Sequence, residues 1–152
     1  MPLIDFVTLE TPVSPKEVLE RDFPDLAPLP IRGGWGYDRE TACIIEPPAD
    51  PDIPFDGVEV EYIFAAHRLY EELIFSSCNG GYEDIGFKLL LQSLQCEDDR
   101  SYDVMKFQVF ARPLQWADQS HPARGPGNGR RRAPIHTGER EYWFDITGFF
   151  GN

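Results

Sequence analysis

The chain has 152 residues, of which 41% are apolar and 13% aromatic, and its mean hydropathy is -0.38. This size suffices for one globular domain that buries about two-thirds of its unfolded surface, and no segment reaches the ~20 apolar residues that span a bilayer. The formal net charge of -12 at pH 7 disfavours direct binding to nucleic acid or to an anionic membrane, and favours a basic partner.

The N-terminal residues and the cysteines predict a cytoplasmic protein. Residues 1–5 place an acid, Asp5, where a secretory signal would have a basic region followed by an apolar run. The three cysteines, Cys43, Cys78 and Cys96, are odd in number and widely spaced. This pattern is typical of reduced thiols rather than of a disulfide framework.

The first predicted elements are a helix and a short strand. Ser14 is a candidate N-cap, Pro15 suits the first turn, and Glu17 completes a capping box, so a helix begins here and ends before Pro24. Residues 33–36 follow a proline-rich extended stretch and form a glycine-rich corner around one tryptophan. A brief strand at 43–45 comes next.

The central segment predicts a strand followed by a helix. Residues 58–64 alternate in hydropathy, which would place Val58 and Tyr62 on a buried face and Glu59 and Glu61 together on the other. Apolar residues then recur at helical spacing from 66 to about 75. Glu71 and Glu72 on that helix are expected to face water.

The second half of the chain predicts three strands and a long loop. The run 87–96 is compatible with a helix or with one arm of a hairpin, and the hairpin is favoured because 104–111 alternates as a strand after a polar turn at 97–101. Residues 112–139 hold four prolines and four glycines and predict a loop. A last strand covers 142–146.

These elements predict a single α+β domain over residues 1–152, with the Pro/Gly/Arg-rich loop at about 112–139. We expect a mainly antiparallel sheet of four to six strands with two or more helices packed on one face. No internal repeat or domain linker interrupts the chain, since the aromatic-rich terminal segments are typical of one shared core.

Motifs of chemistry are sparse, and we predict neither a metal site nor a cofactor. His67, His121 and His136 are scattered, and no cysteine pair has the spacing of a zinc knuckle. Glu59 and Glu61 on one strand face would lie about 7 Å apart, which is compatible with paired-carboxylate hydrolysis. Solvated carboxylates on an outer face are the commoner arrangement.

The acids from Glu46 to Glu61 are the most informative feature, because six carboxylates stand there without one base. They form either a solvated acidic rim or a surface complementary to a basic site, with aromatic anchors nearby. The candidate partner-binding residues are Tyr37, Asp50, Asp52, Phe55, Asp56, Glu59 and Glu61. The arginines at 124 and 130–132 are compatible with a small nucleic-acid patch, but in this acidic chain we favour either pairing with its own acids or a disordered Pro/Gly-rich loop.

Three segments, 30–37, 57–62 and 142–151, carry a resemblance to a family of small bacterial proteins. Some members of that family are immunity proteins of contact-dependent growth-inhibition or similar polymorphic toxin systems. The resemblance implies a non-enzymatic cytoplasmic protein that neutralises a cognate toxin, a basic nuclease being one candidate. The alternatives are a small enzyme using Glu59, Glu61 or His67, and a structural or regulatory binding subunit.

Overall fold

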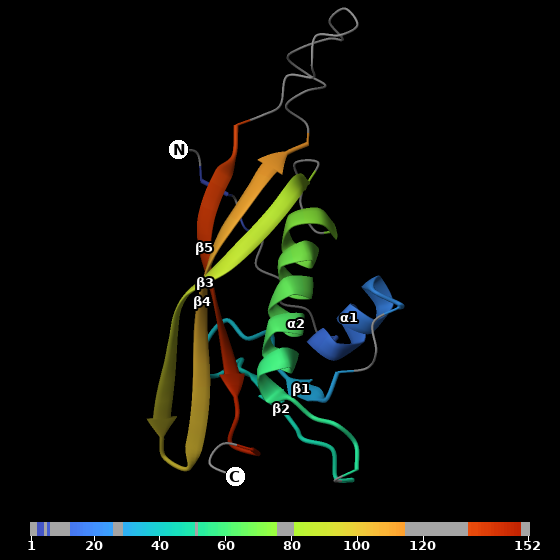
Figure 1. Cartoon of the computed structure of the whole chain (residues 1–152), viewed down its shortest axis with the longest axis vertical. Helices are drawn as coiled ribbons and strands as arrows, with labels where there is room; N and C mark the ends of the chain where they lie inside the picture. The colour runs from blue at the N-terminus through green and yellow to red at the C-terminus, as the bar shows by residue number, and fades with distance from the viewer. Residues whose placement is uncertain are drawn as a thin grey trace, which may run out of the picture.

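A computed structural model describes residues 3–4, 6, 13–25, 29–50, 52–75, 81–114 and 134–149. Its five strands form one sheet in the order β1-β2-β5-β4-β3 (Figure 1). All neighbouring strands are antiparallel except β2 and β5, which run parallel. The elements are α1 (Pro15–Asp22), β1 (Ile31–Gly33), β2 (Cys43–Ile45), α2 (Gly57–Tyr70), the π-helical turn η1 (Glu71–Phe75), β3 (Tyr82–Glu97), β4 (Arg100–Pro113) and β5 (His136–Asp145).

Both α-helices lie on the same side of the sheet, with α2 running along it and α1 beside α2 (Figure 1). The predicted α+β fold is therefore confirmed. The N-cap of α1 is also confirmed, because Ser14 accepts a hydrogen bond from the backbone N–H of Glu17 at 3.3 Å. The strands β4 and β5 extend into both ends of the predicted loop, and residues 115–133 of that loop lie outside the described residues.

The predicted strand at 58–64 is wrong, because these residues form the first half of α2. The carboxylate of Asp56 accepts hydrogen bonds from the N–H groups of Val58 and Glu59 and so caps the helix. The predicted helix at 66–75 is present as the continuation of α2 into η1. One long helix therefore replaces the expected strand and helix.

The burial pattern of α2 explains why the alternation was misleading. The buried side chains recur at spacings of three and four, at Gly57, Val60, Glu61, Phe64, Ala65, Arg68 and Leu69. Two of these buried residues, Glu61 and Arg68, have ionisable side chains. A hydropathy pattern counts them as exposed and therefore does not reveal the buried face of the helix. Val58 and Tyr62, expected in the core, are 49% and 37% exposed.

The hairpin predicted in the second half of the chain is confirmed. The strands β3 and β4 pair antiparallel from Tyr82↔Pro113 to Glu97↔Arg100, so a two-residue turn of Asp98 and Asp99 joins them. Asp98 has a φ of 54°, the left-handed backbone conformation that short hairpin turns require. The last predicted strand is also confirmed, as the second half of β5.

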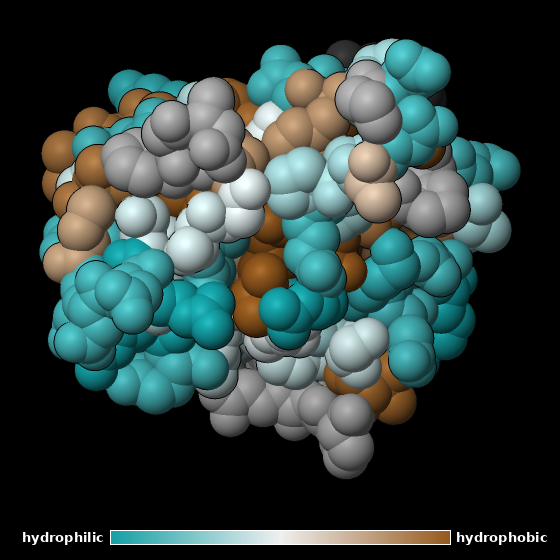
Figure 2. All heavy atoms as spheres, turned by 90° about the horizontal axis from the view of Figure 1, so that it is seen from below, coloured by the Kyte–Doolittle hydropathy of each residue, from teal (hydrophilic) through white to brown (hydrophobic). Residues whose placement is uncertain are grey.

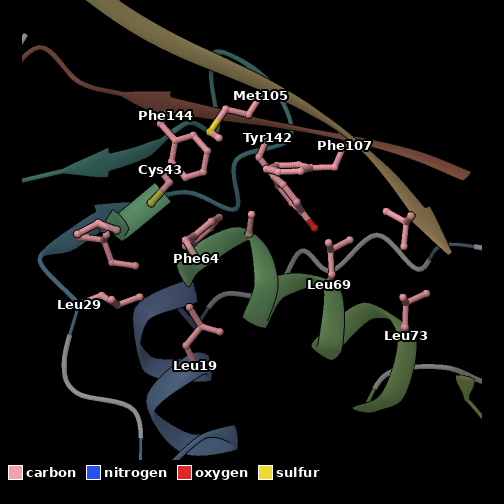
Figure 3. Packing of buried hydrophobic residues seen from close by; sticks show 14 of the residues in the cluster. Leu19, Leu29, Cys43, Phe64, Leu69, Leu73, Met105, Phe107, Tyr142 and Phe144 are labelled. Atoms are coloured by element: carbon pink, nitrogen blue, oxygen red, sulfur yellow. The ribbon is translucent and has the colours of Figure 1, made fainter. Parts of the chain in front are cut away.

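The core lies between the sheet and α2 (Figure 3). Phe64, Leu69 and Leu73 point from the helix towards sheet residues that include Phe107 and Tyr142. Four residues of β4 line the same face and are almost fully buried: Met105, Phe107, Val109 and Ala111. A smaller cluster is formed by Ala42, Tyr102 and Val104 with the half-buried Trp143 against it.

Candidate functional site

Exposed carboxylates gather on the loop between β2 and α2 and on the first turn of α2. Asp50, Asp52, Asp56 and Glu59 are all exposed, and none of them forms an ion pair with another described residue. We call these four residues the acidic surface. It lies at the end of the molecule that Figure 2 views, where hydrophilic residues cover much of the face.

Short-range hydrogen bonds position two of these carboxylates. Asp50 Oδ1 accepts a hydrogen bond from the Asp52 N–H at 2.9 Å, and Asp56 Oδ1 accepts from the Val58 N–H at 3.1 Å. Asp56 also lies at the helix N-terminus, where the helix dipole favours negative charge. Asp50 and Asp56 therefore stabilise the local backbone, whereas Asp52 and Glu59 have no side-chain hydrogen bond among the described residues.

Apolar side chains lie among the acids. Ile53 is 50% exposed on the loop, and Val58 is exposed on the first turn of α2. Phe55, a predicted anchor, is half-buried and packs edge-on against Phe149 with ring centroids 5.3 Å apart. The surface therefore combines carboxylates that have no ion-pair partner among the described residues with accessible aliphatic groups, and Phe55 mainly supports the loop.

Glu61 does not belong to this surface. Its side chain is 1% exposed and lies against Asp103 of β4. Burial, and then the neighbouring acid, raises the pKa of Glu61 to about 10, so the carboxyl is protonated at neutral pH. Glu59 and Glu61 are two residues apart on a helix and point in different directions, so the paired-carboxylate geometry expected for hydrolysis does not form.

Tyr37 belongs instead to a buried polar cluster that the sequence analysis missed. We call it the Glu72 cluster: Tyr37, Arg68, Glu71, Glu72, Arg140 and Tyr142. The expectation that Glu71 and Glu72 face water is wrong, because both are fully buried. The sequence does contain one signal for this cluster: Arg68, Glu71 and Glu72 stand at i, i+3 and i+4, a spacing that brings opposite charges together on one side of a helix.

Glu72 is the common acceptor of this cluster. Its carboxylate accepts hydrogen bonds from Tyr37 Oη at 2.6 Å, Tyr142 Oη at 2.8 Å and Arg140 Nη2 at 2.5 Å. Arg68 Nη2 lies 3.7 Å from Glu72 and donates to Tyr37 Oη at 2.6 Å. Charges from α2 and β5 and a hydroxyl from the loop after β1 therefore meet at one buried carboxylate.

Glu71 and Trp35 surround the other side of Arg68. The guanidinium of Arg68 lies 4.5 Å from the Trp35 ring centroid and donates to Glu71 Oε1 at 3.1 Å. Burial, and then the nearby Asp22, raises the pKa of Glu71 to about 7. The polar groups of the Glu72 cluster hydrogen-bond mostly to one another and link the helical segment to β5. We therefore assign the cluster a structural role.

The remaining candidates are dispersed. His67 is half-buried, and its Nδ1 lies 2.8 Å from the Ile63 carbonyl oxygen within the same helix. Cys43 is buried, which raises the pKa of its thiol, and Cys96 is exposed on β3. Cys78, His121 and the arginines at 124 and 130–132 lie outside the described residues.

The described part of the chain contains neither a group of metal ligands nor a membrane-spanning helix. There, no three His, Cys, Asp or Glu side chains come together as a metal site. No described helix has the length and apolar character needed to cross a membrane. Comparison with protein families, with curated proteins and with solved structures finds no match for this chain.

Proposed function

We propose that this chain is a cytoplasmic immunity protein, without catalytic activity, that neutralises a basic toxin by binding it through the acidic surface. The observation that carries the proposal is the set of four exposed carboxylates with no ion-pair partner among the described residues, placed around Ile53 and Val58. A net charge of -12 adds long-range attraction towards a basic partner.

The carboxylates and the apolar side chains of this surface contribute to binding in different ways. Carboxylates accelerate encounter with a basic protein by electrostatic steering, by up to about 10³-fold at low salt. Affinity comes from apolar groups that are dehydrated at the centre of the interface, and Ile53 and Val58 are available for this. A nuclease cleft that binds phosphates has the complementary charge, so covering it would block the active site.

The test uses a variant that removes charge without disturbing the fold: Asp50→Asn, Asp52→Lys and Glu59→Lys. Asparagine at 50 keeps an acceptor for the Asp52 N–H. Asp56 is left in place because it caps α2, and Glu61 because a lysine there would bury an unpaired charge. We expect the variant to bind the captured partner at least about 100-fold more weakly, because two lysines would then face a basic partner and like charges opposed across an interface cost several kcal/mol.

A matched variant, Glu20→Lys, Asp25→Asn and Asp99→Lys, makes the same change in net charge at exposed positions outside the acidic surface. The partner is captured from the native cells with a tagged copy and then expressed alone and together with each variant. A partner that arrests growth alone, and is neutralised by the matched variant but not by the acidic-surface variant, supports the proposal. Equal neutralisation by both variants contradicts it, and a non-toxic partner favours a structural or regulatory subunit.

A further inference from the structure

Two carboxyl groups meet where the C-terminal end of α1 lies against the helical segment of α2 and η1. Asp22 is the last residue of α1, and Glu71 is the first residue of η1. Their side chains lie within hydrogen-bonding reach of each other. Phe23 packs edge-on against His67, with ring centroids 4.6 Å apart, and so holds the same end of α1 about one helical turn from Glu71. We call Asp22 and Glu71 the carboxyl pair.

Each member of the carboxyl pair has an arginine on one oxygen. Glu71 Oε1 accepts a hydrogen bond from Arg68 Nη1 at 3.1 Å, and Asp22 Oδ1 accepts from Arg21 Nε at 3.1 Å. Glu71 Oε2 is buried and has no hydrogen-bond donor among the described residues. Because an ionised Asp22 is itself only an acceptor, the contact between the two carboxyls requires a proton on one of them.

The surroundings of the pair decide which carboxyl holds this proton. Glu71 is fully buried, whereas the Asp22 side chain is 16% exposed. Burial, and then the contact with Asp22, raises the pKa of Glu71 to about 7. Burial acts to raise the pKa of Asp22 as well, but hydrogen bonds from Glu71 and Arg21 outweigh it and hold that pKa below its ordinary value. The proton therefore lies on Glu71, which donates to the Asp22 carboxylate.

We propose that this shared proton holds the C-terminal end of α1 against the helical segment, and that α1 opens locally when the proton is lost as the pH rises. Two ionised carboxylates then face each other at a site from which most water is excluded, where like charges repel strongly. With eight residues, α1 is the shorter of the two α-helices, and short peripheral elements open at a lower free energy than the core of a sheet. The device is independent of the proposed function.

The charged groups of the Glu72 cluster do not replace the proton. Arg68 is the cation nearest to Glu71, but its Nη2 also lies 3.7 Å from Glu72, so two carboxyls share one positive charge. Arg140 and Tyr142 donate to Glu72. An ionised Glu71 would therefore meet the Asp22 carboxylate without a cation of its own.

Two further groups lie at the end of α1. Arg21 contacts Asp22, but its side chain is 68% exposed and water screens its charge. His67 is the other titratable side chain at this contact, where it packs against Phe23, and its Nδ1 lies 2.8 Å from the Ile63 carbonyl oxygen. The test must therefore separate the titration of the carboxyl pair from that of His67.

The sign of the pH dependence follows from the two states of α1. Opening hydrates Glu71 and returns its pKa from about 7 to the ordinary 4.5. Below pH 4.5 the carboxyl is protonated in both states, so the contribution of the pair to closure is fully present. As the pH rises further, the closed state must take up a proton, and the equilibrium constant for opening grows about tenfold per pH unit. The contribution is lost once the pH passes 7.

Hydrogen exchange measures this opening when the observed rates, recorded by NMR on the full chain from pH 5 to pH 8, are divided by the intrinsic rates. The amide of Phe23 donates to the Leu19 carbonyl at 2.9 Å and reports on the end of α1. We expect its protection to fall about tenfold per pH unit from pH 5 to pH 7 and then to level off. The amides of β4 report on global unfolding and are expected to stay more protected throughout.

Glu71→Gln separates the carboxyl pair from His67. Glutamine is neutral at every pH, and its amide can donate to Asp22 and accept from Arg68. We expect the protection of the Phe23 amide to become independent of pH in this variant. Glu17→Gln removes an exposed glutamate of α1 and is expected to keep the wild-type profile.

Two outcomes of the exchange experiment would overturn the proposal. One is a wild-type protection at Phe23 that does not change with pH, and the other is a fall that Glu71→Gln retains, which would assign the effect to His67. The carbon-13 chemical shift of the Glu71 carboxyl is a second readout that needs no variant. It is expected to titrate near pH 7 in the folded protein, and titration near pH 4.5 would contradict a shared proton.

Discussion

Replacing Glu72 by alanine is expected to destabilise the fold by about 3–5 kcal/mol, as breaking a buried ion pair from one side commonly does. Glu72 accepts hydrogen bonds from Tyr37, Tyr142 and Arg140, and its removal leaves their donors without this acceptor. It also removes one of the two carboxyl groups near the buried cation of Arg68 and leaves the partly protonated Glu71. The loss is therefore larger than that of a single hydrogen bond.

Urea unfolding at pH 7 measures the effect. Glu59→Ala is the matched control, since it removes an exposed glutamate from the same helical segment and is expected to change the free energy of unfolding by less than about 0.5 kcal/mol. Glu72→Gln keeps an acceptor oxygen, so we expect its loss of unfolding free energy to lie between those of Glu72→Ala and Glu59→Ala. Similar losses for Glu72→Ala and Glu59→Ala would show that the cluster contributes little to stability.

The sheet was predictable because its strands carry local signals. Met105, Phe107 and Val109 alternate in the sequence and are buried in the structure, so period and burial agree. The helix α2 was not predictable in the same way, because its buried face includes Glu61 and Arg68. Buried charged residues reverse the hydropathy pattern, and their burial is tolerated because other elements supply partners such as Asp103 for Glu61 and Glu72 for Arg68.

The candidate site likewise has one part that the sequence predicts and one part that it does not. The exposure of Asp50, Asp52 and Asp56 follows from a proline-rich acidic loop without a base, and sequence reasoning reaches it. The half-buried position of Tyr37 depends on contacts with Arg68 and Glu72, which are more than 30 positions away. Such contacts are set by the packing of α2 on the sheet, which no local pattern encodes.

Glu61→Gln is expected to stabilise the protein at neutral pH. Burial raises the pKa of Glu61 from an ordinary 4.5 to about 10, so folding requires proton uptake throughout the interval between those values. Below pH 4.5 the carboxyl is protonated in both the folded and the unfolded chain, and its contribution to stability is fully present. That contribution falls as the pH rises and is lost when the pH passes the folded-state pKa. Glutamine is neutral at every pH and can still donate to Asp103.

The difference in unfolding free energy between Glu61→Gln and wild type should therefore grow with pH. Each unit above the ordinary pKa adds about 1.4 kcal/mol, so the advantage of the variant reaches an upper limit of about 3 kcal/mol at pH 7. Urea unfolding from pH 4 to pH 8 measures it, with Glu59→Gln as the exposed control. The contribution of Glu71 to the free energy of unfolding also falls as the pH rises, because its pKa is raised to about 7 in the folded protein. Glu71 is present in all three proteins, so its contribution cancels in the difference between them. A difference that stays constant with pH would mean that Glu61 is ionised in the folded protein, and that the interior between α2 and β4 admits enough water to solvate its charge.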